Sequence, residues 1–236
     1  MINNKNVLCV IPARGGSKGI PFKNMKKING KSLIKIAAEC AHKCKFIDRI
    51  ILSTDSEIIA EEGRKCRIKV PFLRPKRLSG DRISDFQVLE HALKTLEKKE
   101  KKTYEYIIML QPTSPLRDYK DIETCIYKIH SENWDSIWTI SKSDPKNHPL
   151  KQLNLDKSNN LSLYDKKGNE IIARQQLSTL FYRNGVAYVM TRECILDQKS
   201  IMGKKSGGYL IDSHQISIDS PNDIKLAEYY MNIKEK

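Results

Sequence analysis

The segment that decides the fold is VLCVIPARGGSKGIPFKN, residues 7–24. Its first part, Val7 to Pro12, is a short apolar run with several β-branched residues, which is typical of a buried parallel strand. A loop with three glycines follows at once. Glycines let backbone N–H groups turn toward an anion, and Arg14, Lys18 and Lys23 add positive charge for phosphates. We therefore expect a phosphate site at the end of the first strand, with a triphosphate as the best-matched ligand.

This loop differs from two common nucleotide-binding motifs. A P-loop, G-x-x-x-x-G-K-[ST], needs Lys and then Ser or Thr after its second glycine, and the segment lacks that order. It also lacks G-x-G-x-x-G, so a nicotinamide dinucleotide loses its main support.

Strands and helices alternate along the rest of the chain. We expect further strands at 49–54, 69–73, 106–111, 136–141 and 185–190. We expect helices at 33–44, 56–65, 85–98 and 118–132, and a last helix capped by Ser220 that runs from Pro221 to about Lys234. The alternation predicts an α/β fold with a mostly parallel sheet covered by helices on both faces. Ligands of such sheets bind outside the carboxyl ends of the strands.

Residues 142–183 break this alternation. Polar residues, Pro145, Pro149 and an Asn159-Asn160 turn separate short apolar runs there. Roughly 40 residues make a poor core alone, so we interpret the segment as a β-hairpin arm inserted in a single domain spanning 1–236. The arm needs a surface to pack on, which favours a homodimer.

Composition excludes several classes of protein. The 236 residues are 39% hydrophobic, which argues against wholesale disorder. No apolar run approaches the roughly 18 to 20 residues of a membrane span, so we expect a cytoplasmic protein without a membrane partner. Six cysteines without a C-x-x-C pair indicate neither a disulfide framework nor a zinc knuckle. The net charge of +14 comes largely from dispersed lysines, so we do not expect a nucleic-acid partner.

Residues 11–24 resemble the signature of the acylneuraminate cytidylyltransferases, also called CMP-sialic acid synthetases: I-P-A-R-G-G-S-K-G-I-P-x-K-N. Further matches follow in order along the chain: DRIILSTD (48–55), LRPKRL (73–78), LQPTSPLR (110–117), HPLK (148–151), RQQL (174–177), NGVAY (184–188) and IDSPND (218–223). The resemblance implies the nucleotide-diphospho-sugar transferase type of α/β fold and a homodimer. It also implies transfer of CMP from CTP to the anomeric hydroxyl of a nine-carbon 2-keto sugar acid, with release of pyrophosphate.

The resemblance assigns roles to individual residues. Lys23 matches the lysine that stabilises charge on the phosphates, and we expect it to act with Arg14 and Asp219 in catalysis. The nucleotide-binding residues that we predict are Arg14, Gly15, Gly16, Ser17, Lys18, Asn24, Arg74 and Ser84. Beside Ser84, Asp85 occupies the position of a serine that usually contacts the nucleotide. The sugar-acid residues that the resemblance implies are Gln111, Lys151, Arg174, Asn184 and Tyr188. Lys151 and Arg174 lie on the arm, which often reaches the acid across the dimer interface.

The sequence departs from the family in two further places. An arginine at the return of the arm is shifted by one residue, to Arg183. The family's Asp-x-Asp, which holds magnesium, reads Ser217-Ile218-Asp219 here. Mg²⁺ takes oxygen ligands and keeps several waters, so we expect Asp219 to hold it together with triphosphate oxygens. The alternative for Asp219 is a carboxylate that stabilises the start of the last helix.

Other functions stay open at this point. A cytidylyltransferase for an eight-carbon sugar acid shares the fold and reaction type, but RQQL and NGVAY favour the nine-carbon family, whose substrates include N-acetylneuraminic, legionaminic and pseudaminic acids. A non-catalytic nucleotide-binding homologue is supported only by the missing first aspartate. Nucleic-acid binding through the +14 charge would predict steeply salt-dependent affinity.

Overall fold

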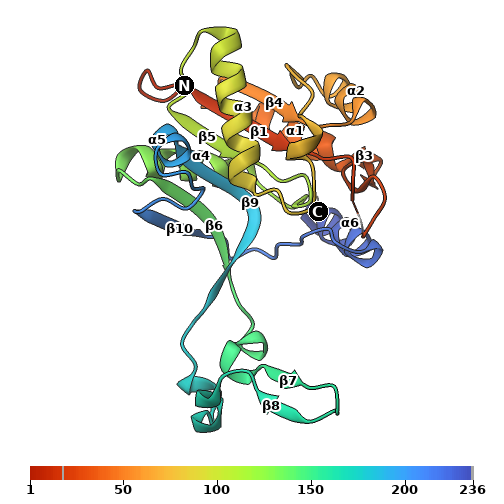
Figure 1. Cartoon of the computed structure of the whole chain (residues 1–236), viewed down its shortest axis with the longest axis vertical. Coiled ribbons are helices and arrows are strands. Elements are labelled where there is room, and N and C mark those ends of the chain that lie inside the picture. The colour runs from red at the N-terminus through yellow and green to blue at the C-terminus, as the bar shows by residue number, and fades with distance from the viewer. Residues whose placement is uncertain (18, 235–236) are drawn as a thin grey trace.

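The body of the molecule is built on one twisted sheet between two layers of helices (Figure 1). The computed structural model describes residues 1–17 and 19–234. Within these residues the strand order of the main sheet is β10-β6-β9-β5-β1-β4. The strands are β1 (Val7–Pro12), β4 (Arg49–Ser53), β5 (Tyr106–Met109), β6 (Ser136–Lys142), β9 (Phe181–Thr191) and β10 (Ser206–Leu210). A small hairpin, β2 (Lys27–Ile28) and β3 (Lys31–Ser32), lies outside this sheet.

The predicted parallel sheet is confirmed, with one strand as the exception. β1 pairs in parallel with β4 and β5, and β10 pairs in parallel with β6. β9 runs antiparallel between β5 and β6 because it returns from the arm rather than from a crossover helix. The carboxyl ends of β1, β4 and β5 therefore meet at one edge of the sheet.

The helices cover both faces, as the alternation predicts. Helices α1 (Leu33–Lys43), α2 (Glu57–Lys65) and α4 (Tyr119–Ser131) pack on one face, and α3 (Asp85–Glu100) and α5 (Arg192–Leu196) on the other. Successive residues of β1 alternate between the two cores: Cys9 lies in the first and Val10 in the second. A third cluster seats the last helix, α6 (Pro221–Lys234), against the β2–β3 hairpin.

One predicted strand of the sheet is wrong, and one observed strand was not predicted. The expected strand at 69–73 is a single β-bridge between Ile51 and Lys69, because Pro71 has no N–H to continue the pairing. The edge strand β10 was not predicted, since its SGGYL sequence carries two glycines and little strand propensity. Gly207 and Gly208 have a packing reason, because a Cβ on either would lie 2.7 Å from an isoleucine methyl of β6.

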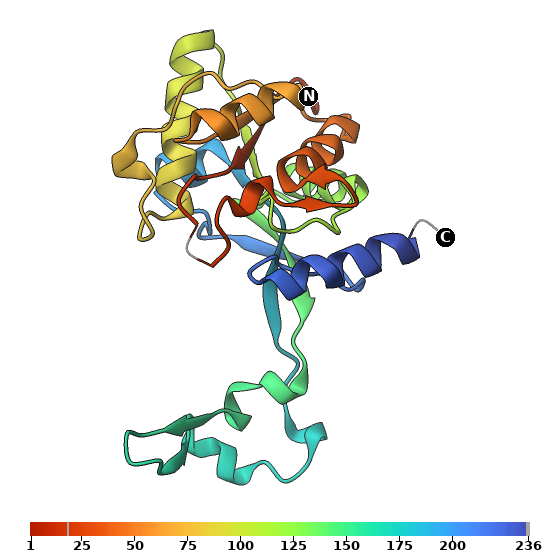
Figure 2. The ribbon, with the colours of Figure 1, turned by 90° about the vertical axis from the view of Figure 1, so that its right-hand side faces the viewer.

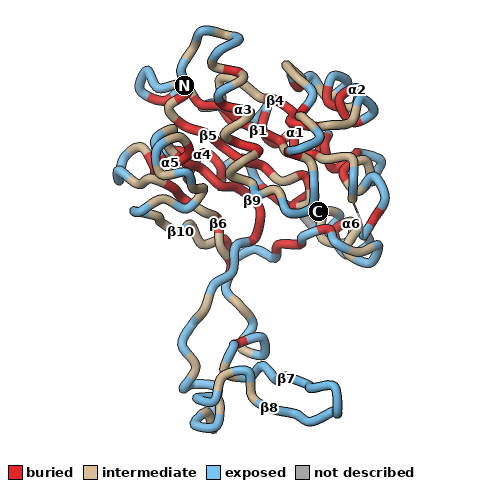
Figure 3. Tube along the Cα trace, in the orientation of Figure 1, coloured by how far each residue is buried: buried red, intermediate tan, exposed pale blue. Residues whose placement is uncertain are grey.

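Residues 142–183 form an arm that projects from the body (Figure 1, Figure 2). β6 and β9 twist together toward it, and its tip is the hairpin of β7 (Leu153–Leu155) and β8 (Leu161–Leu163). Short 3₁₀ turns fill the rest: Pro145–Asn147, Pro149–Lys151, Lys166–Glu170 and Arg174–Gln176. Figure 3 shows that the arm is largely exposed while the strands of the body are buried. The arm therefore lacks a core of its own, as its length predicts.

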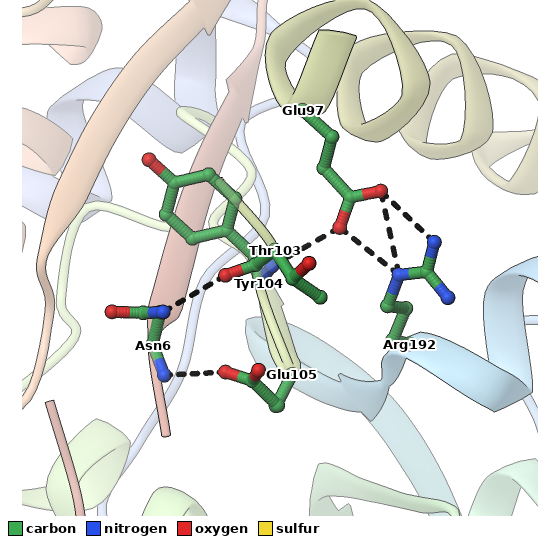
Figure 4. Close-up of polar contacts among 6 residues, drawn as sticks. All are labelled: Asn6, Glu97, Thr103, Tyr104, Glu105 and Arg192. Atoms are coloured by element: carbon green, nitrogen blue, oxygen red, sulfur yellow. Dashed lines mark hydrogen bonds and ion pairs between the residues drawn. The ribbon is translucent and has the colours of Figure 1, made fainter. Parts of the chain in front are cut away.

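A polar network closes the sheet at the amino ends of β1 and β5 (Figure 4). Glu97 of α3 accepts hydrogen bonds from the Tyr104 backbone N–H (3.0 Å) and from Arg192 Nε and Nη2 (3.0–3.3 Å). Glu105 accepts the Asn6 N–H at 2.6 Å. These contacts fix the edge of the sheet opposite the carboxyl ends of its parallel strands.

Among the helices of the described residues, none is both long and apolar enough to cross a bilayer.

Candidate functional site

The loop after β1 is held against the end of β4. The Gly15 N–H donates to Asp55 Oδ1 at 2.9 Å, and a Cβ on Gly15 would lie 3.1 Å from Ser56 Cβ. A side chain at this position would therefore require Ser56 or the loop to shift by a few tenths of an ångström. Gly16 and Ser17 follow on the same loop, and Lys18 lies outside the described residues.

A strained residue sets the direction of Lys23. Phe22 precedes the short 3₁₀ turn Lys23–Met25 with φ 50° and ψ 40°, in the left-handed region that is uncommon for a bulky side chain. Asn24 is buried, and its Nδ2 donates to the Arg14 carbonyl at 3.3 Å. The turn is thereby tied to the residues that follow β1.

Two cations of the predicted site are paired with carboxylates. Arg14 Nη1 lies 2.6 Å from Asp81 Oδ1, and Lys23 Nζ lies 2.9 Å from Asp219 Oδ1. All four side chains are partly exposed to solvent, so these pairs contribute little to stability. Each cation is therefore available to exchange its carboxylate for a phosphate.

A cavity of about 270 Å³ lies at the carboxyl ends of β1 and β5. Arg14, Lys23, Asn24, Arg74 and Gln111, all predicted for the site, line it. We name it the nucleotide cavity. Its other lining residues are Pro12, Leu78, Ser79, Gly80, Asp81, Ile83, Asp85, Val88, Pro112 and Thr113.

A second cavity of about 280 Å³ adjoins it, and Gln111 lines both. We name it the acid cavity. Predicted residues Asn184 and Tyr188 of β9 line it, with Tyr182, Arg183, Gly185, Gln215 and Ser217. Gln111 thus lies on the boundary between the two cavities.

Asn184 supports the acid cavity through the fold of β9. Its Oδ1 lies 2.7 Å from the Thr139 hydroxyl and accepts the Val186 N–H at 3.1 Å, while its Nδ2 donates to Ser141 Oγ at 3.0 Å. The register of β6 and β9 shifts at this point, between Trp138 and Ile140. The Asn184 amide therefore closes a bulge in the sheet.

Arg117 fixes the backbone of Gln111 by a hydrogen bond to its carbonyl oxygen. It is buried, its Nη2 donates to the Gln111 carbonyl oxygen, and burial lowers the pKa of its guanidinium. Ser114 N also donates to the same carbonyl at 3.2 Å. The backbone of Gln111 is therefore fixed by two donors.

Other predicted residues lie away from both cavities. Ser84 caps α3: its hydroxyl accepts the Gln87 N–H, and Gln87 Oε1 accepts the Ser84 N–H, which forms a capping box. Lys151 and Arg174 lie exposed on the arm. Arg174 lines a third cavity of about 1120 Å³ at the base of the arm, which also involves His214 and shares Tyr182, but not Gln111, with the acid cavity. A single chain therefore does not bring the two arm cations to the acid cavity.

The lining residues that were not in the predicted set include Asp85, Arg183 and Gln215. Burial raises the pKa of Asp85, against the opposing effect of Arg183 and Arg74. Asp85 and Arg183 were both signalled by departures from the family pattern: Asp85 replaces a serine, and Arg183 is shifted by one residue. Gln215 had no comparable signal, because its position depends on the path of an irregular segment before α6.

Asp219 is the residue that can hold a divalent metal. Its side chain is 71% exposed, with Oδ1 against Lys23. Asp223, rather than Asp219, accepts the backbone N–H groups before α6, from Asp219 at 2.9 Å and Ser220 at 2.6 Å. Within the described residues no group of three or more acidic, His or Cys side chains could hold a metal ion alone. Mg²⁺ needs only one or two carboxylates when phosphates and waters complete its octahedron, so Asp219 fits a magnesium that arrives with a triphosphate.

The fold is an α/β sheet whose paired cavities lie at the carboxyl ends of the strands, where ligands of such sheets bind. A sequence profile described as cytidylyltransferase matches residues 8–235, and the chain belongs to this family. It is therefore a CTP-dependent nucleotidyltransferase.

Several curated proteins are similar to this chain over most of its length. The chain is 33% identical over 229 residues to a CMP-N,N'-diacetyllegionaminic acid synthase of Campylobacter jejuni, covering 97% of this chain and 96% of the relative. It is 29% identical over 231 residues to a pseudaminic acid cytidylyltransferase of the same species, covering 97% of each. It is 30% identical over 220 residues to an N-acylneuraminate cytidylyltransferase of Streptococcus agalactiae, covering 92% of this chain and 51% of the relative.

Solved structures share the fold at low sequence identity. A CMP:2-keto-3-deoxy-manno-octonic acid synthetase complexed with CTP superposes with a TM-score of 0.73 at 16% identity, covering 98% of this chain and 100% of that chain. A 4-diphosphocytidyl-2C-methyl-D-erythritol synthase from Anaerococcus prevotii gives a TM-score of 0.65 at 15% identity, covering 98% of each. The predicted nucleotide-diphospho-sugar transferase type of fold is confirmed.

Proposed function

We propose that this chain transfers CMP from CTP to the anomeric hydroxyl of a nine-carbon 2-keto sugar acid and releases pyrophosphate. The observation that carries the proposal is the pair of adjoining cavities that share Gln111. The nucleotide cavity holds the cations suited to a triphosphate, and the acid cavity offers amide, phenol and guanidinium groups suited to a hydroxylated acid. Relatives named for legionaminic, pseudaminic and N-acylneuraminic acids support the same substrate class.

The reaction forms one bond and breaks another. The anomeric oxygen attacks the α-phosphorus, the bond from that phosphorus to the bridging oxygen of pyrophosphate breaks, and the hydroxyl proton passes to solvent water. Negative charge grows on the leaving pyrophosphate, and such transfers depend on positioning and charge neutralisation. Lys23 and Arg14, once exchanged from Asp219 and Asp81, neutralise that charge. Gln111, fixed by Arg117 and Ser114, orients the attacking sugar.

We assign the metal role to Asp219, which would hold Mg²⁺ together with triphosphate oxygens. When bound, the ion supplies further neutralisation of phosphate charge. Ser217 is exposed on the wall of the acid cavity, two residues before Asp219, and we propose that it orients a metal-bound water.

We propose that the arm forms a homodimer and delivers Lys151 and Arg174 to the partner's acid cavity. The arm exposes Leu153, Leu155, Leu161, Tyr164 and Ile172, each with more than half of its surface accessible in one chain. An exposed group of this kind marks an interaction surface. We place the reaction in the cytoplasm, where CTP is made; the six free cysteines suit that reducing compartment.

The test is pyrophosphate release from CTP and Mg²⁺ with a panel of 2-keto acids. The panel holds N-acetylneuraminic, legionaminic, pseudaminic and the eight-carbon 3-deoxy-octulosonic acid, and mass spectrometry identifies the CMP-sugar. Turnover with one nine-carbon acid supports the proposal and selects the substrate. Preferred turnover of the eight-carbon acid, or CTP binding without turnover of any member, would overturn it.

A further inference from the structure

Asp85 is a carboxylate in the nucleotide cavity whose oxygens accept no hydrogen bond from the described part of the chain. It is the first residue of α3, directly after the cap Ser84, and it is only partly accessible. No described residue forms a hydrogen bond or close ion pair with it, and the positive charges of Arg183 and Arg74 act on it only through longer-range electrostatics. Taking a charged group out of water without a hydrogen bond is costly, and burial raises the pKa of this carboxyl. A carboxylate kept at such a cost indicates that a bound ligand supplies the missing hydrogen-bond donor.

Arg74 supplies the complementary group. It lines the same cavity, is only 5% exposed, and its Nε is buried without a partner in the described part of the chain. Its backbone N–H donates to the Thr54 carbonyl at 2.7 Å, which fixes its position after β4. The wall of the cavity therefore carries one group that only donates and one that only accepts.

The position of these two groups in the cavity favours contact with a base rather than with phosphates. The cations for phosphates, Arg14 and Lys23, come from the loop after β1. Apolar Leu78, Ile83 and Val88 come from the segments around Arg74 and Asp85 and suit a flat ring. A carboxylate close to a triphosphate would repel it, whereas a carboxylate beside a base can accept a hydrogen bond.

Donor and acceptor together match cytosine and not uracil. Cytosine presents O2 and N3 as acceptors and the N4 amino group as a donor, whereas uracil presents N3–H as a donor and O4 as an acceptor. A carboxylate accepts from the cytosine amino group but faces uracil O4 with a second acceptor. We propose that Asp85 accepts a hydrogen bond from the N4 amino group of CTP and so selects CTP over UTP, with Arg74 donating to the O2 and N3 edge. This inference rests on the proposed function, because it takes CTP as the nucleotide.

The test is the variant Asp85→Asn. Its amide has nearly the same shape and can donate to uracil O4 after rotation. Binding of CTP and of UTP is measured by calorimetry with Mg²⁺ and without any sugar acid, and kcat/KM for both nucleotides is measured with the best acid of the panel. We expect the CTP-to-UTP ratio of affinities to fall by about 10- to 100-fold. Glu90→Gln, which removes a charge from the outer surface of the same helix, should leave the ratio unchanged.

Two further readouts decide between this role and others. Removing a poorly solvated charge should leave the melting temperature equal or higher. A lower melting temperature with loss of both nucleotides would show that Asp85 is structural and overturn the proposal. Equal weakening of CTP and UTP would show a contact to the ribose and overturn it as well. Selective CTP binding that depends on Asp85, without turnover of any acid, would overturn the proposed function alone.

Discussion

Gly185 should be required for the position of Gln111, and Gly185→Ala tests this. The residue has φ +75°, where a side chain costs about 1–2 kcal/mol. An added Cβ would also lie 2.6 Å from Ser114 Oγ and 3.0 Å from Gln111 Oε1. Ser114 is buried, so relief of that overlap adds roughly 1–3 kcal/mol. We expect the free energy of unfolding to fall by about 2–5 kcal/mol in total.

The activity of the same variant should fall as well. The amide end of Gln111 is the neighbour that moves most easily, and its displacement should remove the hydrogen bond that we propose it makes to the sugar acid. Loss of such a bond corresponds to about a 10- to 100-fold lower kcat/KM for the acid. CTP affinity, measured separately by calorimetry, should change much less.

Gly30→Ala is the matched control. Gly30 has φ +77°, in the turn between β2 and β3, but nothing lies within 4 Å of its added Cβ. The Gly30→Ala variant should lose only the contribution of the strained backbone, about 1–2 kcal/mol of the free energy of unfolding measured in urea, and it should keep full activity. If Gly185→Ala is no less stable than Gly30→Ala and turns over the acid normally, the steric reasoning is refuted.

Four further predictions address the site and the fold. Lys23→Ala should lower kcat by about 100- to 1000-fold with an unchanged circular dichroism spectrum; a normal kcat would contradict its role on the phosphates. Arg174→Ala should raise the KM for the acid about 10-fold and leave CTP affinity intact, and the reverse pattern would remove it from the acid site. Asp219→Asn should raise the Mg²⁺ concentration for half-maximal rate about 10-fold, whereas Ser217→Asp should lower it; an unchanged magnesium titration of both would exclude the metal site. Glu97→Ala should lower the free energy of unfolding by about 1–3 kcal/mol, because the buried Tyr104 N–H loses its acceptor, while activity at 25 °C persists; urea unfolding with no loss would show that water replaces the carboxylate.

The sequence by itself determined the body of the fold. Apolar runs such as Val7–Pro12 and helical periods such as Leu33–Lys43 are local signals, because burial of a strand or of a helix face depends on residue type at a fixed spacing. The glycine-rich loop after β1 was likewise recognisable, since its glycines and cations are consecutive in the chain. Arg14 and Lys23 could be predicted from this loop, and Gln111 from the family resemblance of residues 110–117; all three line one cavity.

Only the tertiary structure decided how distant segments share a site. The antiparallel direction of β9 depends on its return from the arm, and it brings Arg183 and Tyr188 beside Gln111. Asp85 enters the nucleotide cavity while the neighbouring Ser84 turns to cap α3, a choice that follows from the orientation of the helix start. Lys151 and Arg174 stay on the arm, away from the acid cavity of their own chain. Such placements depend on contacts between residues far apart in sequence, and spacing along the chain does not encode them.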